Sequence, residues 1–155
     1  MPRKSKLPPY GMEVIPPKRL KQIVPILPRP QVRRSEIPLE ISGTTKPYRK
    51  LADYFGTLWR QSFNTAILKR YERDDPQGFT EHLNKEDAEN YSGHIALAAL
   101  TGRGHLRLQI DNQEHSLLLR AGTVVHLDPA LPHVVSPPDT QEPRYLLFLG
   151  KQRHP

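Results

Sequence analysis

In the second half of the chain, short apolar runs are separated by turn residues. Within one run, Leu106, Leu108 and Ile110 alternate with Arg107 and Gln109, so one side of the segment is apolar. Runs of this kind recur about every ten residues, a spacing typical of a β-sandwich or barrel rather than of βαβ units. The predicted strands span residues 79–83, 94–101, 104–110, 115–120, 123–127, 133–136 and 144–149.

Residues 51–71 follow a different period. Apolar or small side chains recur there at steps of three and four residues, with charged side chains on the other face. The apolar face comprises Leu51, Tyr54, Phe55, Leu58, Trp59, Ser62, Ala66 and Ile67. The pattern predicts one amphipathic helix that packs against a sheet and ends before Asp74-Asp75-Pro76.

Residues 1–50 are rich in proline and contain ten of the seventeen prolines of the chain. Repeated prolines favour a polyproline II or β-like backbone, so we expect an extended arm without a regular helix. Apolar clusters such as Ile23-Val24 and Ile26-Leu27 indicate that the arm docks on its own domain, a sister subunit or a larger assembly. The alternative is a solvated tail.

The charge is divided between the arm and the rest of the chain. Residues 1–50 hold twelve Lys or Arg against three acids, near +9, whereas residues 51–155 are near −2. We therefore expect a basic arm, 1–50, attached to a mildly acidic domain, 51–155. Such an arm suits a protein surface or sister subunit and would allow non-specific contact with nucleic acid.

Cysteine is absent, which excludes disulfides and thiol nucleophiles. No apolar run approaches the ~18 residues of a membrane span, and the N-terminus has no long apolar signal region. We expect a cytoplasmic protein that does not insert into membranes.

Two histidines stand at positions suited to a site. His133 opens a predicted strand eleven residues after Gly122, and Arg144 follows it by a further eleven. His82 lies fifty-one residues before His133, and Asn84 would share its strand face. We expect both imidazoles to face the interior of the barrel. His105, His115 and His126 are predicted to fill strand faces or be exposed, and His154 to contact solvent. His94 opens a strand after Gly93 and fits either a site or a strand face.

This order of residues resembles the signature of the Fe(II)/2-oxoglutarate-dependent oxygenases. That family has His-x-Asp, a second His about fifty residues later, and then an Arg. The resemblance covers residues 71–150 and implies that His82 and His133 bind iron. It implies that Arg144 holds the far carboxylate of 2-oxoglutarate, and it puts Asn84 where the metal-binding acid belongs.

Asn84 departs from the family, because an amide offers a carbonyl oxygen but no negative charge to Fe(II). If the register differs, Glu81, Glu86 or Asp87 would supply the carboxylate. The stretch 100–135 also resembles the cupins, which share the architecture. Their first motif, His-x-His followed by Glu, has no counterpart in this chain.

We thus expect a mainly β protein, a small double-stranded β-helix (jelly roll, cupin-like) preceded by one amphipathic helix and a Pro-rich arm. One functional reading is an oxygenase-like protein that uses Fe(II) and 2-oxoglutarate to hydroxylate an unidentified substrate. The other is a non-catalytic jelly-roll module that lost the acid. Its basic arm would tether it in a larger protein or nucleoprotein assembly.

Overall fold

The computed structural model describes residues 8–23, 36–39, 46–71, 89–136, 138–139 and 144–153. Two helices and nine strands lie in these ranges. In chain order they are β1 (Tyr10–Val14), α1 (Pro17–Ile23), β2 (Glu36–Leu39), α2 (Lys46–Leu58), β3 (Thr65–Tyr71), β4 (Tyr91–Thr101), β5 (Arg103–Ile110), β6 (Gln113–Arg120), β7 (Thr123–Leu127), β8 (His133–Val135) and β9 (Arg144–Gln152).

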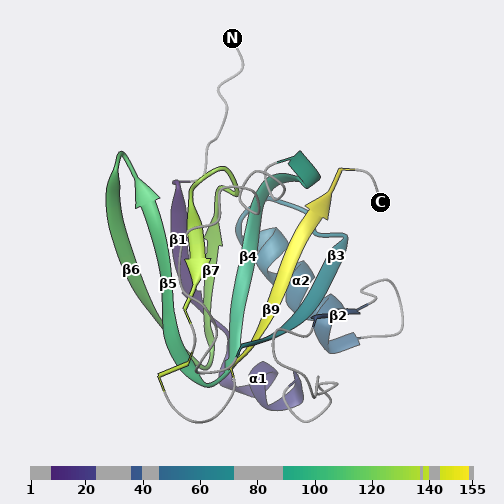
Figure 1. Cartoon of the computed structure of the whole chain (residues 1–155). Coiled ribbons are helices and arrows are strands. Elements are labelled where there is room, and N and C mark those ends of the chain that lie inside the picture. Colours follow the sequence, from purple (N-terminus) through teal and green to yellow (C-terminus); the bar gives the residue numbers. More distant parts are fainter. Residues whose placement is uncertain are drawn as a thin grey trace.

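The strands form two sheets, and all their pairings are antiparallel. The large sheet has the order β1-β7-β4-β9-β3-β2, and the small sheet has the order β6-β5-β8. Figure 1 shows α2 against one face of the large sheet, with α1 near its lower end. This arrangement confirms the predicted mainly β, jelly-roll architecture.

Each face of the large sheet has its own apolar core. The inner core lies between the two sheets and contains Leu97 of β4, Leu106 of β5 and Phe148 of β9. The outer core lies under α2, where Phe55 and Trp59 pack on the sheet. Because successive strand residues point to opposite faces, each central strand contributes to both cores.

Six of the seven strands predicted for the second half of the chain are confirmed as β4 to β9. The turn between β5 and β6 has Asp111 at φ 51° and Asn112 at φ 64°. Two successive positive φ angles match the type I′ turn that two-residue hairpins prefer. The predicted strand at 79–83 lies outside the described residues.

The prediction of one helix over 51–71 was wrong in its second half. Helix α2 ends at Leu58, where Arg60 adopts a left-handed φ of 53° and the Gln61 N–H donates to the Gly56 carbonyl at 2.7 Å. These are features of the capping motif that stops a helix. The apolar run Ala66-Ile67-Leu68 then belongs to β3, where alternation places its members on opposite faces.

The expectation that the first fifty residues contain no helix was also wrong. Pro17 occupies the first position of α1, where a missing N–H costs nothing, and the Leu20 N–H donates to the Pro16 carbonyl. The extended backbone predicted for this region is found in β1 and β2, which pair with β7 and β3. The division of the chain at residue 50 stays a prediction.

Two histidines meet on the outer face of the large sheet. The Nδ1 atoms of His94 and His126 lie 2.8 Å apart, and the Trp59 ring centroid is 4.6 Å from that of His126. Burial, and then the neighbouring His94, lower the pKa of His126 from 6.5 to about 4. Burial also lowers the pKa of His94, against an opposing effect of Asp128.

Neither described helix combines the length and the apolar composition that crossing a bilayer requires.

The histidine pair predicts a pH dependence of stability. Because the folded-state pKa of His126 lies below 6.5, protonation of this histidine favours the unfolded state. The stability that the neutral His126 gives the folded protein is therefore fully present above pH 6.5 and is lost as the pH falls toward about 4. We expect His126→Gln to remove about 1–3 kcal/mol of the stability difference between pH 7 and pH 4.5, measured by urea unfolding. The matched control His115→Gln should keep the full difference, and equal curves for both variants would contradict the assignment.

Candidate functional site

Arg144 is a fully buried cation. It is the first residue of β9, and its side chain points to the same face as Leu146 and Phe148 of the inner core. Its relative exposure is 0%, which is rare for an arginine that forms no ion pair with an acid among the described residues. The start of β9 therefore places a positive charge between the two sheets.

Two features of the small sheet accommodate the guanidinium. Gly104 has no side chain, and a Cβ there would lie 2.5 Å from Nη1 of Arg144. Nη1 donates to the carbonyl of Ser136 at 2.8 Å and to that of His105 at 3.4 Å. Ser136 is itself fixed, because its hydroxyl accepts from the His105 N–H at 2.8 Å and its own N–H donates to the His105 carbonyl.

The rest of the guanidinium lacks an acceptor. Nε and Nη2 of Arg144 are buried and find no hydrogen-bond partner in the part of the chain that the structure describes. Burial lowers the pKa of Arg144 to about 10, and Tyr71 and Asp139 oppose that shift. A carboxylate would satisfy both donors at once, because the guanidinium fork matches its geometry.

His133 faces the same interior from the small sheet. It pairs with Leu108 of β5, and directly opposed residues in an antiparallel pair point to one face, so its side chain shares the inner face with Leu108. Its Nδ1 lies 2.6 Å from the Leu131 carbonyl, which can only accept a hydrogen bond. Nδ1 therefore carries the proton in the neutral ring, and Nε2 carries the lone pair that a metal requires.

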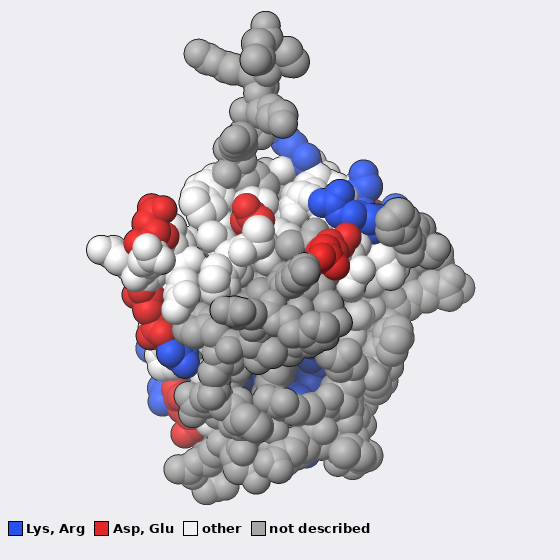
Figure 2. Space-filling model, turned by 45° about the horizontal axis from the view of Figure 1, so that its top comes forward, with Lys and Arg blue, Asp and Glu red and all other residues white. Residues whose placement is uncertain are grey.

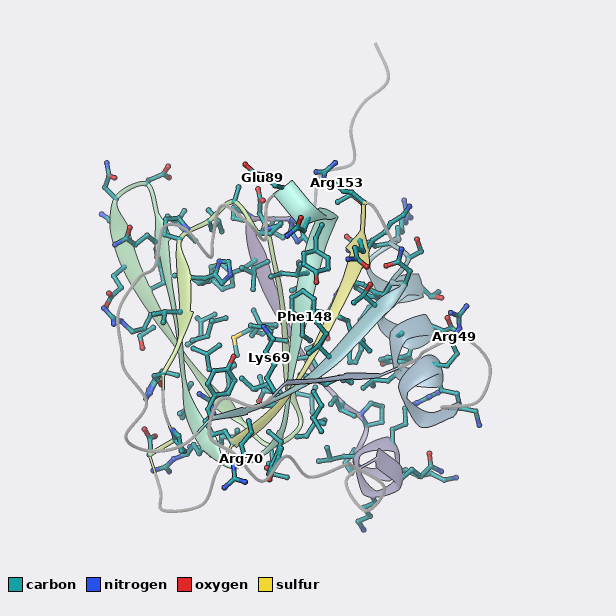
Figure 3. The ribbon with its side chains drawn as sticks, turned by 45° about the vertical axis from the view of Figure 1, so that its right-hand side comes forward. Arg49, Lys69, Arg70, Glu89, Phe148 and Arg153 are labelled. Atoms are coloured by element: carbon teal, nitrogen blue, oxygen red, sulfur yellow. The ribbon has the colours of Figure 1, made fainter. Side chains whose placement is uncertain are left out.

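Lys69 and Tyr71 of β3 also face the inner core, next to Arg144. Tyr71 pairs with Arg144 and Lys69 pairs with Leu146. The Lys69 ammonium lies 5.0 Å from the Phe148 ring centroid, and Figure 3 shows both side chains in the space between the sheets. Among the described residues, Arg144 and Lys69 thus bring positive charge to this interior. Because the sequence pattern predicted a helix for this segment, Lys69 and Tyr71 were not identified as residues that face the interior.

The structure brings two of the four predicted site residues, His133 and Arg144, to one interior. His82 and Asn84 lie outside the described residues, so their approach to His133 stays a prediction. Within the described ranges, no three His, Asp or Glu side chains gather as a metal site. His94 and His126 do converge, but they lie on the outer face.

Charged side chains of both signs lie at the end of the molecule that holds the β5–β6 turn and the last residues of β9. Exposed Asp111 and Glu114 belong to the β5–β6 hairpin, and exposed Lys151 and Arg153 lie at the end of β9. Figure 2 shows acidic atoms mostly on one side of this end and basic atoms mostly on the other.

No family model and no curated protein matches this sequence.

Several solved structures share this fold over most of the chain. A prolyl-4-hydroxylase from Pseudomonas putida matches with a TM-score of 0.67 and 16% identity over 94% of this chain and 93% of that chain. An oxidoreductase of the 2OG-Fe(II) oxygenase family from Burkholderia pseudomallei matches with a TM-score of 0.66 and 16% identity, over 94% and 87%. HygX from Streptomyces hygroscopicus, with nickel and 2-oxoglutarate bound, gives 0.67 and 13% identity, over 92% and 82%. The chain has the fold of the 2OG-Fe(II) oxygenases.

The unsatisfied guanidinium predicts an unusual stability effect. Arg144→Met removes a buried charge while it keeps the apolar stem, so we expect the unliganded protein to lose less than about 1 kcal/mol or to gain stability. Leu146→Ala, on the same face of the same strand, should lose about 2–5 kcal/mol by cavity formation. Guanidinium chloride unfolding measures both. A loss in Arg144→Met as large as that in Leu146→Ala would show that Arg144 is a structural residue.

Proposed function

We propose that this protein is an Fe(II)- and 2-oxoglutarate-dependent oxygenase that hydroxylates an organic substrate at the open end of the jelly roll. The observation that carries the proposal is the buried Arg144 fork, whose Nε and Nη2 have no acceptor among the described residues. A fully buried arginine in this state is costly unless a ligand completes it.

The residues present fit the cosubstrate. The distal carboxylate of 2-oxoglutarate would accept from Nε and Nη2 of Arg144, while Nη1 stays on the Ser136 and His105 carbonyls. Those carbonyls keep the guanidinium plane fixed before the ligand arrives, which reduces the entropy lost on binding. Lys69 adds a second positive charge two residue pairs along the sheet.

The residues also fit part of the metal set. His133 would bind Fe(II) through Nε2, since Nδ1 is held by the Leu131 carbonyl. His82 and Asn84 complete the proposed set from outside the described residues. Iron with bound 2-oxoglutarate supplies the oxygen-activating chemistry of this enzyme class.

The apolar lining of the interior has its own part in the reaction. Leu108, Leu146 and Phe148 exclude bulk water from the space between the two sheets. A dry surrounding strengthens the interaction between Arg144 and a carboxylate. It also protects reactive species from side reactions.

Anaerobic titration of the protein with Fe(II) and 2-oxoglutarate tests this function. We expect a metal-to-ligand absorption band and a rise in melting temperature with 2-oxoglutarate concentration. Arg144→Met should weaken 2-oxoglutarate binding about tenfold to a hundredfold, because it removes a charge-assisted pair worth about 1.5–3 kcal/mol.

Arg107→Met is the matched control for this titration, because Arg107 pairs with Glu114 on the outer side of the small sheet. It should bind 2-oxoglutarate as the parent does. An absent band together with an unchanged melting temperature would overturn the enzyme reading. That result would favour the non-catalytic module. The argument for this alternative is the predicted position of Asn84 in the place of the metal-binding acid.

Asn84→Asp tests the metal set separately. If Asn84 stands at the acid's position, a carboxylate there should tighten Fe(II) binding by about tenfold or more, since it adds negative charge to the ligand set. Asn112→Asp, in the exposed β5–β6 turn, adds the same charge elsewhere and should change nothing. Equal affinities for both variants would mean that Asn84 is not a ligand.

A further inference from the structure

A groove opens between α1 and α2, away from the interior site. Its volume is about 720 Å³, and its described walls include Lys18 and Arg19 of α1 and Lys50, Tyr54 and Leu58 of α2. Figure 3 shows both helices outside the two sheets, on the opposite side of the large sheet from the space that holds Lys69. The groove is therefore independent of the proposed oxygenase site.

The side of α2 that faces the groove is partly apolar. Lys50, Tyr54 and Leu58 follow at steps of four residues and form one row, whereas Leu51 and Phe55 on the neighbouring face are buried against the sheet. Tyr54 is 38% exposed and Leu58 is 48% exposed. A helix that already buries one apolar face thus presents a second apolar row to solvent.

The charge of the walls is positive. Asp53 is the single acid among the described lining residues, and its carboxylate lies 3.2 Å from the Arg49 guanidinium. Lys18, Arg19 and Lys50 have no acidic counterpart in the described walls. A ligand with carboxylates complements this set of charges.

The exposed apolar side chains and the positive charge of the groove together indicate which class of partner would bind there. Nucleic acid would require aromatic platforms for its bases, but the Arg19 guanidinium already lies 5.3 Å from the Tyr54 ring centroid and occupies one face of that ring. Leu58 offers an aliphatic contact that bases do not need. A groove between two helices that presents apolar and basic positions suits an acidic amphipathic helix.

We propose that the α1–α2 groove binds an acidic amphipathic helical segment of a partner protein. The partner's apolar side chains would cover Leu58 and the exposed edge of Tyr54, and its carboxylates would pair with Lys18 and Lys50. Because α1 belongs to the basic arm, such binding would give the arm a role in partner recognition.

Fluorescence anisotropy with a labelled Glu/Leu peptide of about four helical turns tests this proposal on the full chain. We expect saturable binding that weakens with salt, and a loss of tenfold or more in the double variant Lys18→Glu/Lys50→Glu. Leu58→Ser should weaken binding severalfold at unchanged salt dependence, because it removes an apolar contact only. The control Lys151→Glu/Arg153→Glu makes the same charge change at the end of β9 and should bind as the parent does.

Three outcomes would overturn the proposal. A scrambled peptide of equal composition that binds as tightly would indicate diffuse electrostatics, and equal losses in the two charge-reversed variants would indicate the same. Absence of peptide binding, with an oligo-dT probe that binds and is lost in Lys18→Glu/Lys50→Glu, would identify a nucleic-acid surface. Circular dichroism of each variant confirms that the fold is kept. The binding measurements do not depend on Fe(II) or 2-oxoglutarate.

Discussion

A buried guanidinium without a full set of acceptors is the constraint on which the rest of this structure depends. Arg144 enters the space between the sheets because Gly104 leaves room for it and because Ser136 presents a carbonyl to Nη1. Nothing among the described residues satisfies Nε and Nη2. Such a group costs stability, so its retention in an otherwise apolar core indicates a ligand rather than a packing role.

The two faces of the large sheet divide stability and chemistry between them. The outer face is closed by α2, whose Phe55 and Trp59 rings stack with centroids 4.9 Å apart, and it buries a largely apolar set of side chains. The inner face carries Arg144, Lys69 and His133, whereas the partly buried polar pair of the outer face is His94 with His126. A well-packed outer core can hold the sheet in place while the inner face remains incomplete without a ligand.

The predictable part of the fold was the part with a clear period. Alternation and turn residues predicted β4 to β9. The end of α2 was missed, because a left-handed Arg60 has no signal comparable to glycine and because Ala66-Ile67-Leu68 fits either period. Strand β3 was missed with it, and so were Lys69 and Tyr71.

The sequence predicted candidate residues of the site but not how they contact one another. Spacing singled out His133 and Arg144, and both face the inner core. The open Nε and Nη2 of Arg144 arise from the way β5, β8 and β9 come together, which sequence spacing does not encode. The hydrogen bond that fixes the tautomer of His133 is local, to the Leu131 carbonyl two residues earlier. The His94–His126 pair, like the open Arg144 fork, comes from strand pairing, since it depends on the register between β4 and β7.

The most direct test of this account is a crystal structure grown without oxygen in the presence of Mn(II) and 2-oxoglutarate, with the metal located by its anomalous scattering. The account predicts a manganese peak about 2 Å from Nε2 of His133. It also predicts a 2-oxoglutarate carboxylate on Nε and Nη2 of Arg144. A metal bound elsewhere, or a 2-oxoglutarate molecule that leaves the Arg144 fork open, would contradict it.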